Sequence, residues 1–165
     1  MRTFTRVSAA LAAILSLSAA GASAQSANIN ATATVYQALT VTGARPLDFG
    51  SVFPGVAKSI VVSDATSGRF DLTGQASANV NVSFTLPTNL TSGANNLPIG
   101  TWTGCTNATN TTAGCSSFTP SASATPTAMS GAGALFVWVG GTVSPAANQA
   151  AGSYTGTVTL TAAYF

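Results

Sequence analysis

The chain has 165 residues, of which only 5% are charged, and it contains no histidine. Ordinary soluble domains carry about 25% charged residues, so uncharged polar side chains must cover most of the surface. Beyond residue 24 three basic and three acidic side chains remain, and three scattered cations cannot form the patch that a nucleic-acid backbone requires. The composition excludes nucleic-acid binding, and so low a charge favours association between chains.

The first 24 residues have the pattern of a secretory signal peptide. Arg2 and Arg6 precede an apolar stretch, and small residues end at Ala24, where we expect cleavage. A membrane anchor is the alternative, but serines interrupt the stretch, which is shorter than the roughly 20 apolar residues that span a bilayer. We therefore predict export, followed by an N-terminal extension at residues 25–36 and one domain at residues 37–165.

Apolar and polar side chains alternate over residues 27–41, with Gln37 as the break in the apolar positions. A run this long is about three times the usual strand length, so we expect two strands in series. The first is either an ordinary strand paired within its own chain or a strand lent to another copy. Its apolar face consists of Ala27, Ile29, Ala31, Ala33 and Val35.

The middle of the chain alternates short strand patterns with turn signals. Strands are expected at KSIVVS, at ASANVNVSFTL and around residues 99–102, whereas residues 106–131 are expected to form an exposed insert of low order. The apolar run ALFVWVGGTV should end in a tight turn, because Gly140 and Gly141 can supply positive φ angles. With no apolar stripe at helical spacing, the pattern predicts an all-β antiparallel sandwich of about seven to nine strands.

A final strand is predicted over the end of the sequence, where apolar residues and glycines occupy one face and threonines the other. A terminal strand needs neighbours that hold it, and these neighbours need not all come from the same chain. The face opposite the threonines includes Gly152, Tyr154, Val158, Leu160, Ala162 and Tyr164.

Two cysteines, Cys105 and Cys115, are close in sequence. In an exported chain they favour a structural disulfide, which would contribute about 2.5–3 kcal/mol through loop closure. The alternative, a metal pair, lacks further soft ligands.

Catalytic groups are scarce, since histidine and glutamate are absent and Asp48, Asp64 and Asp71 are separated. Turn hydrogen bonds or a surface ion pair with Arg69 account for the three aspartates. We predict no enzymatic activity, no cofactor and no metal site.

The penultimate residue is Tyr164, and Gly152 stands fourteenth from the end. This ending resembles that of subunits of bacterial chaperone–usher fimbriae. The stretches ALTVTGARPLDFGSVFPG and GGTVSPAANQAAGSYTGTVTLTAAYF also resemble an uncharacterised secreted bacterial domain family allied to spore coat protein U. The resemblance implies an immunoglobulin-like (pilin-like) Greek-key sandwich that lacks one strand. In fimbriae a periplasmic chaperone covers the open groove until the next subunit's N-terminal extension fills it.

On this resemblance, residues 27–35 would be the donor strand, and the predicted face of the final strand would line the acceptor groove and bind the chaperone. The chain would then be a non-catalytic subunit of a surface fibre or coat, with identical subunits, a periplasmic chaperone and an outer-membrane usher as partners. It would pass through the periplasm to the cell surface and take part in adhesion. The alternative is a monomeric secreted module that binds a glycan or surface ligand near Trp102 and the loop between the cysteines.

Overall fold

The computed structural model describes residues 24–165, so the predicted signal peptide lies outside the described residues apart from Ala24. The described residues fall into two units, residues 24–34 and Val35–Phe165. The regular elements of the described residues are all β-strands. Residues 24–165 contain no helix long and apolar enough to cross a membrane.

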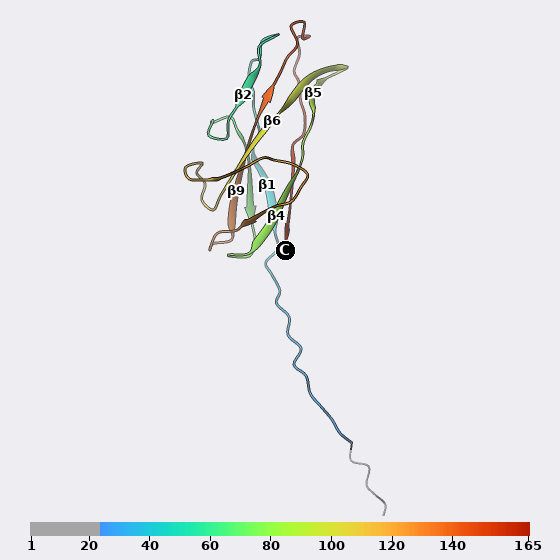
Figure 1. The fold of residues 1–165 in the computed structure, drawn as a ribbon, viewed down its shortest axis with the longest axis vertical. Coiled ribbons are helices and arrows are strands. Elements are labelled where there is room, and N and C mark those ends of the chain that lie inside the picture. Colours follow the sequence, from blue (N-terminus) through green and yellow to red (C-terminus); the bar gives the residue numbers. More distant parts are fainter. Residues whose placement is uncertain (1–23) are drawn as a thin grey trace, which may run out of the picture. The chain divides into compact units, whose positions relative to one another are not determined.

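The unit Val35–Phe165 is a sandwich of two antiparallel sheets (Figure 1). The larger sheet has the order β1-β3-β9-β6-β5, with β2 also paired to β9 and β7 to β6, and the smaller sheet has the order β10-β4-β8. The predicted all-β sandwich is confirmed, with slightly more strands than expected. The strands are β1 (Thr40–Arg45), β2 (Lys58–Ile60), β3 (Gly68–Thr73), β4 (Asn79–Thr85), β5 (Asn89–Ser92), β6 (Asn95–Asn107), β7 (Ser116–Phe118), β8 (Thr125–Ala128), β9 (Ala134–Val143) and β10 (Thr159–Tyr164).

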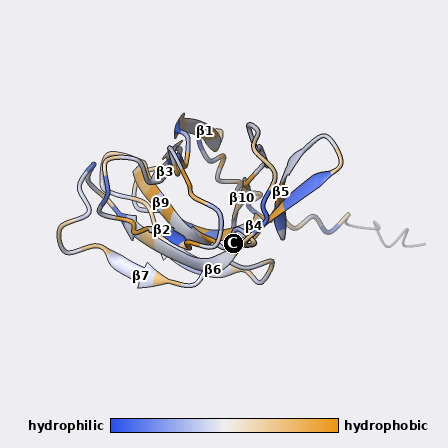
Figure 2. Cartoon of the chain, turned by 90° about the horizontal axis from the view of Figure 1, so that it is seen from above, coloured by the Kyte–Doolittle hydropathy of each residue, from blue (hydrophilic) through white to orange (hydrophobic). Residues whose placement is uncertain are grey.

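The alternation in β4 explains how the two sheets enclose a core. Val80, Val82 and Phe84 are buried, while Asn81 and Ser83 between them are only half-buried. On the same face β10 places Leu160 opposite Phe84. The apolar faces of the two sheets therefore meet inside the sandwich, and β9 is seen as a largely hydrophobic strand (Figure 2).

Two groups of buried side chains make up the core. The first core cluster comprises Leu72, Val80, Val82, Phe84, Met129, Leu135, Val137, Val139 and Leu160. The second core cluster comprises Phe49, Ile60, Leu97, Ile99 and Val143.

The tight turn predicted at Gly140 and Gly141 is wrong, because β9 continues through both residues to Val143. The glycines serve close packing instead. A side chain at Gly140 would collide with the carbonyl of Ile60, and one at Gly141 would press against the ring of Trp102.

The segment predicted as a loosely ordered insert is also more regular than expected. It contains β7 and β8 and the buried side chain of Met129. Before them, the strand expected around residues 99–102 is much longer and forms β6. Its register against β9 shifts between Gly100 and Thr103, where Thr101 has a φ of 48°. This bulge lets β6 pair with both β5 and β7 along its length.

At both ends of the sequence the strands are shorter than the patterns suggest. Of the two strands expected over residues 27–41, the structure has only β1, and residues 24–39 form none. The final strand, β10, begins only at Thr159. Before it, a single bridge between Thr155 and Thr91 ties the segment 150–158 to β5. The alternating patterns are present in both places, but the backbone partners are not.

Candidate functional site: a groove between two strand edges

A groove of about 1150 Å³ lies between the β1 side of the larger sheet and the segment 150–158. Both walls are edges: β1 pairs only with β3, and β10, which follows the second wall, pairs only with β4. The side chains that line the groove between the walls are mainly apolar; they include Leu47, Phe49, Val52, Phe70, Leu90, Leu97, Ile99 and Val139.

The first wall consists of the end of β1 and the turns that follow it, up to Pro54. Hydrogen bonds hold it against the start of β3: the Arg45 guanidinium donates to the carbonyl oxygen and the hydroxyl of Ser67, at 2.6 and 2.7 Å. The Asp48 carboxylate accepts the Gly50 N–H at 2.7 Å, and Gly50 has the positive φ that this turn needs. The predicted turn role of Asp48 is found.

The second wall is extended backbone that lacks a ladder on the groove side. Thr155 exchanges both backbone hydrogen bonds with Thr91, at 2.8 and 3.0 Å. Because successive residues of an extended chain direct their N–H and C=O groups to opposite sides, the groups of Tyr154 and Gly156 face the groove. These groups can pair with an incoming strand.

A network of side-chain hydrogen bonds fixes the end of this wall that lies next to Gln149. The Gln149 amide donates to the Tyr154 hydroxyl at 2.7 Å and to the carbonyl of Asn96 at 3.0 Å. The Tyr154 hydroxyl in turn donates to the carbonyl of Ala150 at 2.8 Å. These hydrogen bonds hold the wall in place although no strand pairs with it on the groove side.

The floor of the groove is the open side of the second core cluster. Phe49, Leu97 and Ile99 belong to that cluster and also line the groove. A sandwich core is normally covered by strands on both faces, whereas here Phe49, Leu97 and Ile99, each at most 8% exposed, border the groove.

The residues predicted to form the acceptor face lie in two places. Gly152, Tyr154 and Val158 line the groove. The other three lie along β10, outside the groove lining, and pack with the first core cluster; they are Leu160, Ala162 and Tyr164. Sequence reasoning missed the opposite wall and the floor. Its available signal was the unusual number of apolar residues in the turn-rich stretch after β1.

Tyr164 joins three segments at the lower end of the sandwich. Its hydroxyl accepts the Gln75 N–H at 2.6 Å and donates to the Gln37 carbonyl at 2.9 Å. Its ring packs edge-on against Tyr36, with the centroids 5.4 Å apart. A side chain at Gly74 would collide with this hydroxyl, so glycine is required there.

The residues predicted as the donor face are exposed. Residues 24–34 contain no strand, and Ile29 and Val35 keep 94% and 91% of their surface accessible. Large apolar side chains that are this exposed mark a surface that contacts a partner.

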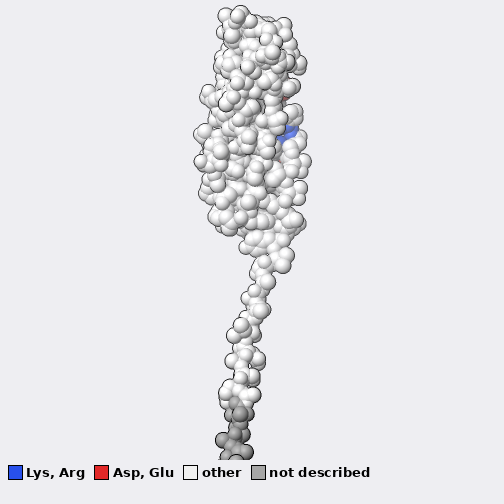
Figure 3. Space-filling model, turned by 90° about the vertical axis from the view of Figure 1, so that its right-hand side faces the viewer, with Lys and Arg blue, Asp and Glu red and all other residues white. Residues whose placement is uncertain are grey.

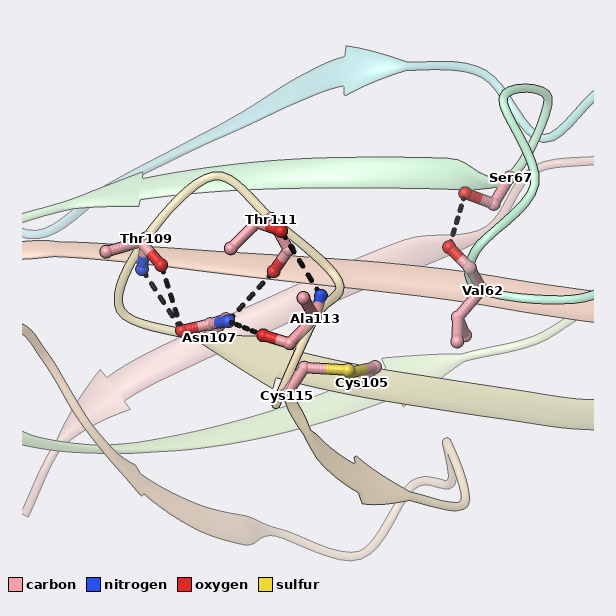
Figure 4. The surroundings of a disulfide bond; sticks show 8 residues. All are labelled: Val62, Ser67, Cys105, Asn107, Thr109, Thr111, Ala113 and Cys115. Atoms are coloured by element: carbon pink, nitrogen blue, oxygen red, sulfur yellow. Dashed lines mark hydrogen bonds between the residues drawn. A yellow bond between two sulfur atoms is a disulfide. The ribbon is translucent and has the colours of Figure 1, made fainter.

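The residues of the alternative binding module lie on β6 and in the loop that follows it. Trp102 is half-buried and packs against both core clusters. The predicted disulfide between Cys105 and Cys115 is present, with the Cα atoms 5.8 Å apart. Inside the loop that it closes, the Asn107 side chain donates to the carbonyls of Thr111 and Ala113 (Figure 4). The loop is thus held by its own hydrogen bonds.

Charge is sparse over the described residues, and the face in Figure 3 is almost entirely uncharged. Asp71 pairs with Arg69 at 2.7 Å, and Asp64 accepts the Val61 N–H at 2.9 Å, as their predicted structural roles require. Residues 24–165 contain no group of three or more side chains placed to hold a metal ion.

Comparison with known proteins gives one match, in which the family model described as "Domain of unknown function (DUF4402)" covers residues 39–164. No curated protein and no solved structure matches the chain.

Proposed function

The chain belongs to the DUF4402 family, and we propose that it is a non-catalytic structural subunit of a bacterial surface fibre or coat whose copies join by exchanging a strand. The groove carries this proposal, because it opens one side of the core between two unpaired backbone edges. Such edges recruit an added strand. The resemblance of both ends of the chain to chaperone–usher subunits and to the spore coat protein U group supports the same conclusion.

The occupant that fits the groove is residues 27–35 of another copy. This segment has no strand partner in its own chain and presents apolar side chains at every second position. It is nine residues long, close to the ten consecutive residues, 149–158, that line the second wall of the groove. Side chains on one face would enter the groove, and the polar face would meet water.

An antiparallel alignment of these two segments gives a definite register. Val35 would lie opposite Ala150, Ala31 opposite Tyr154 and Ile29 opposite Gly156. The large donor side chain then meets a glycine, and the small one meets a tyrosine. This register also places the donor backbone against the N–H and C=O groups of Tyr154 and Gly156 that face the groove.

The groove favours one direction of entry. Its lining ends at Gly43 and Val158, below which β1 and β10 approach each other. At the other end, beside Pro54 and Gln149, the Gly55 N–H donates to the Ala146 carbonyl at 3.0 Å. The donor continues into a folded domain after Val35, and in the antiparallel register it leaves the groove beside this contact. Donor and acceptor surfaces are then different, and such a heterologous contact can be repeated from copy to copy into an open linear polymer.

Transit to the surface would require protection of the groove. An unpaired edge beside exposed core promotes aggregation, so a periplasmic chaperone that fills the groove, and an outer-membrane usher that exchanges it for the donor, are the partners that we propose. The site of function is then the cell surface, where the polymer would serve adhesion or coat formation.

The test is electrophoresis of surface-sheared protein in SDS, with and without boiling. We expect a ladder at subunit multiples that collapses to one band on boiling. Ile29→Asp should remove the ladder, because a carboxylate would have to be buried in the groove. Asn28→Asp, on the outward face of the donor, should leave it intact.

A single band in both lanes, with folded monomer in the medium, would contradict the proposal. The binding-module alternative would then lead. Circular dichroism of both variants controls for folding, since neither position belongs to the sandwich.

A further inference from the structure

If strand exchange occurs as proposed, the connection between neighbouring sandwiches is very short. Val35 is the last donor residue, and the Gln37 carbonyl already accepts a hydrogen bond from Tyr164 of its own domain. Tyr36 alone separates them. Two successive peptide units span at most about 7.5 Å between Cα atoms, so the donor's domain must touch the rim of the groove that it fills.

The surface on the donor's side of this contact is the exit end, which we define as Tyr36, Gln37, Tyr164 and Phe165. Tyr36 is 54% exposed and Phe165 is 66% exposed. The exit end contains no charged side chain.

The surface on the acceptor's side is the tip loop, residues 53–56, where Phe53 and Val56 are exposed by 70% and 57%. In the proposed register Val35 lies opposite Ala150, next to Gln149. The Gln149 N–H and the Gly55 N–H both donate to the carbonyl of Ala146, each at 3.0 Å. The tip loop is therefore attached to the place where the donor leaves the groove.

We propose that the tip loop of one copy packs on the exit end of the next, as a second contact between subunits that is separate from the inserted strand. This inference rests on the proposed function. Neither surface contains a charged side chain, and each exposes two large apolar or aromatic residues. Exposed groups of this kind mark interaction surfaces. The contact would hold successive sandwiches at a fixed angle, because one residue of linker and one packed interface leave little freedom.

The test is disulfide trapping between copies. In assembled protein carrying Phe53→Cys and Phe165→Cys, mild oxidation should give a ladder that survives boiling without reductant and collapses with reductant. The matched control pairs Phe53→Cys with Ala124→Cys. Ala124 is exposed in the loop before β8, away from both surfaces. The control should give at least tenfold less boiling-resistant ladder.

A boiling-sensitive ladder without the covalent one would overturn this inference and leave strand exchange standing. Equal trapping in the control pair would overturn it too. Loss of the boiling-sensitive ladder in unmodified protein would remove the proposed function and this inference together.

Charge complementation gives a second readout that does not depend on new cysteines. Phe53→Asp alone should lower the temperature at which the ladder collapses, and adding Phe165→Lys should restore it. Failure of restoration, with Phe53→Asp folded as a monomer, would contradict the contact.

Discussion

The two core clusters have similar apolar composition but different surroundings. The first lies between β3 and β9 on one side and β4 and β10 on the other, where both ladders are continuous. The second has β2, β6 and β9 on one side and the groove on the other. The difference arises at Thr159, because the chain joins a ladder only from that residue onward.

Hydrophobic patterning therefore does not guarantee a closed core. The segment 150–158 and β10 carry the same alternation, yet only β10 is paired along its length. Where the second ladder is missing, the core borders the groove, although Phe49, Leu97 and Ile99 are each at most 8% exposed. The half of the domain that contains the groove, the open half, is thus suited to binding a strand. The half that contains the first core cluster, the closed half, stabilises the fold.

The largest expected effect is on the free energy of unfolding, which a mutation in the first core cluster should lower much more than a mutation in the groove wall. Leu72 is 1% exposed in the first core cluster, and Leu72→Ala should lower the free energy of unfolding by about 3 kcal/mol. Leu47 is half-buried in the groove wall, and Leu47→Ala should cost a monomer less than about 1 kcal/mol while weakening the polymer ladder. Urea unfolding in the Ile29→Asp background, where no polymer should form, measures both. Equal losses would contradict the distinction.

A peptide of residues 27–35 should close the open half. Added to the Ile29→Asp chain at a hundred times its dissociation constant, it should raise the free energy of unfolding by about 2.7 kcal/mol, because it binds only the folded state. Thermal unfolding measures the shift. The same peptide with aspartate in place of Ile29 is the control, and a shift of equal size with it would show that the groove does not select the donor.

The smallest effect concerns the lower end of the closed half. Tyr164→Phe removes a hydroxyl that bonds both Gln75 and Gln37, and we expect a loss of about 1–2 kcal/mol in the free energy of unfolding. Tyr36→Phe retains the ring that packs on Tyr164 and should change it by less than about 0.5 kcal/mol. Chemical denaturation of both variants tests this, and an equal loss in the two would show that the hydrogen bonds of the Tyr164 hydroxyl are not the source of the effect.

The sequence correctly predicted the parts of the fold that depend on residues close together in the chain. The alternation in β4 and the spacing of Cys105 and Cys115 both led to correct predictions, since side-chain period and loop length are visible in the sequence. Gly140 and Gly141 misled, because their role is to admit Ile60 and Trp102, which are distant in the chain. The sequence showed that Leu47 and Phe49 are apolar but not that they face residues 150–158, since long-range pairing brings them together.

The bulge in β6 has a spectroscopic consequence. The register shift around Thr101 lies beside Trp102, whose indole packs against both core clusters. The other tryptophan, Trp138, is only 3% exposed. Trp102 packs against the second core cluster, and residues of that cluster form the floor of the groove. We therefore expect the contribution of Trp102 to the fluorescence to change when the groove is filled, whereas the contribution of the buried Trp138 should stay constant.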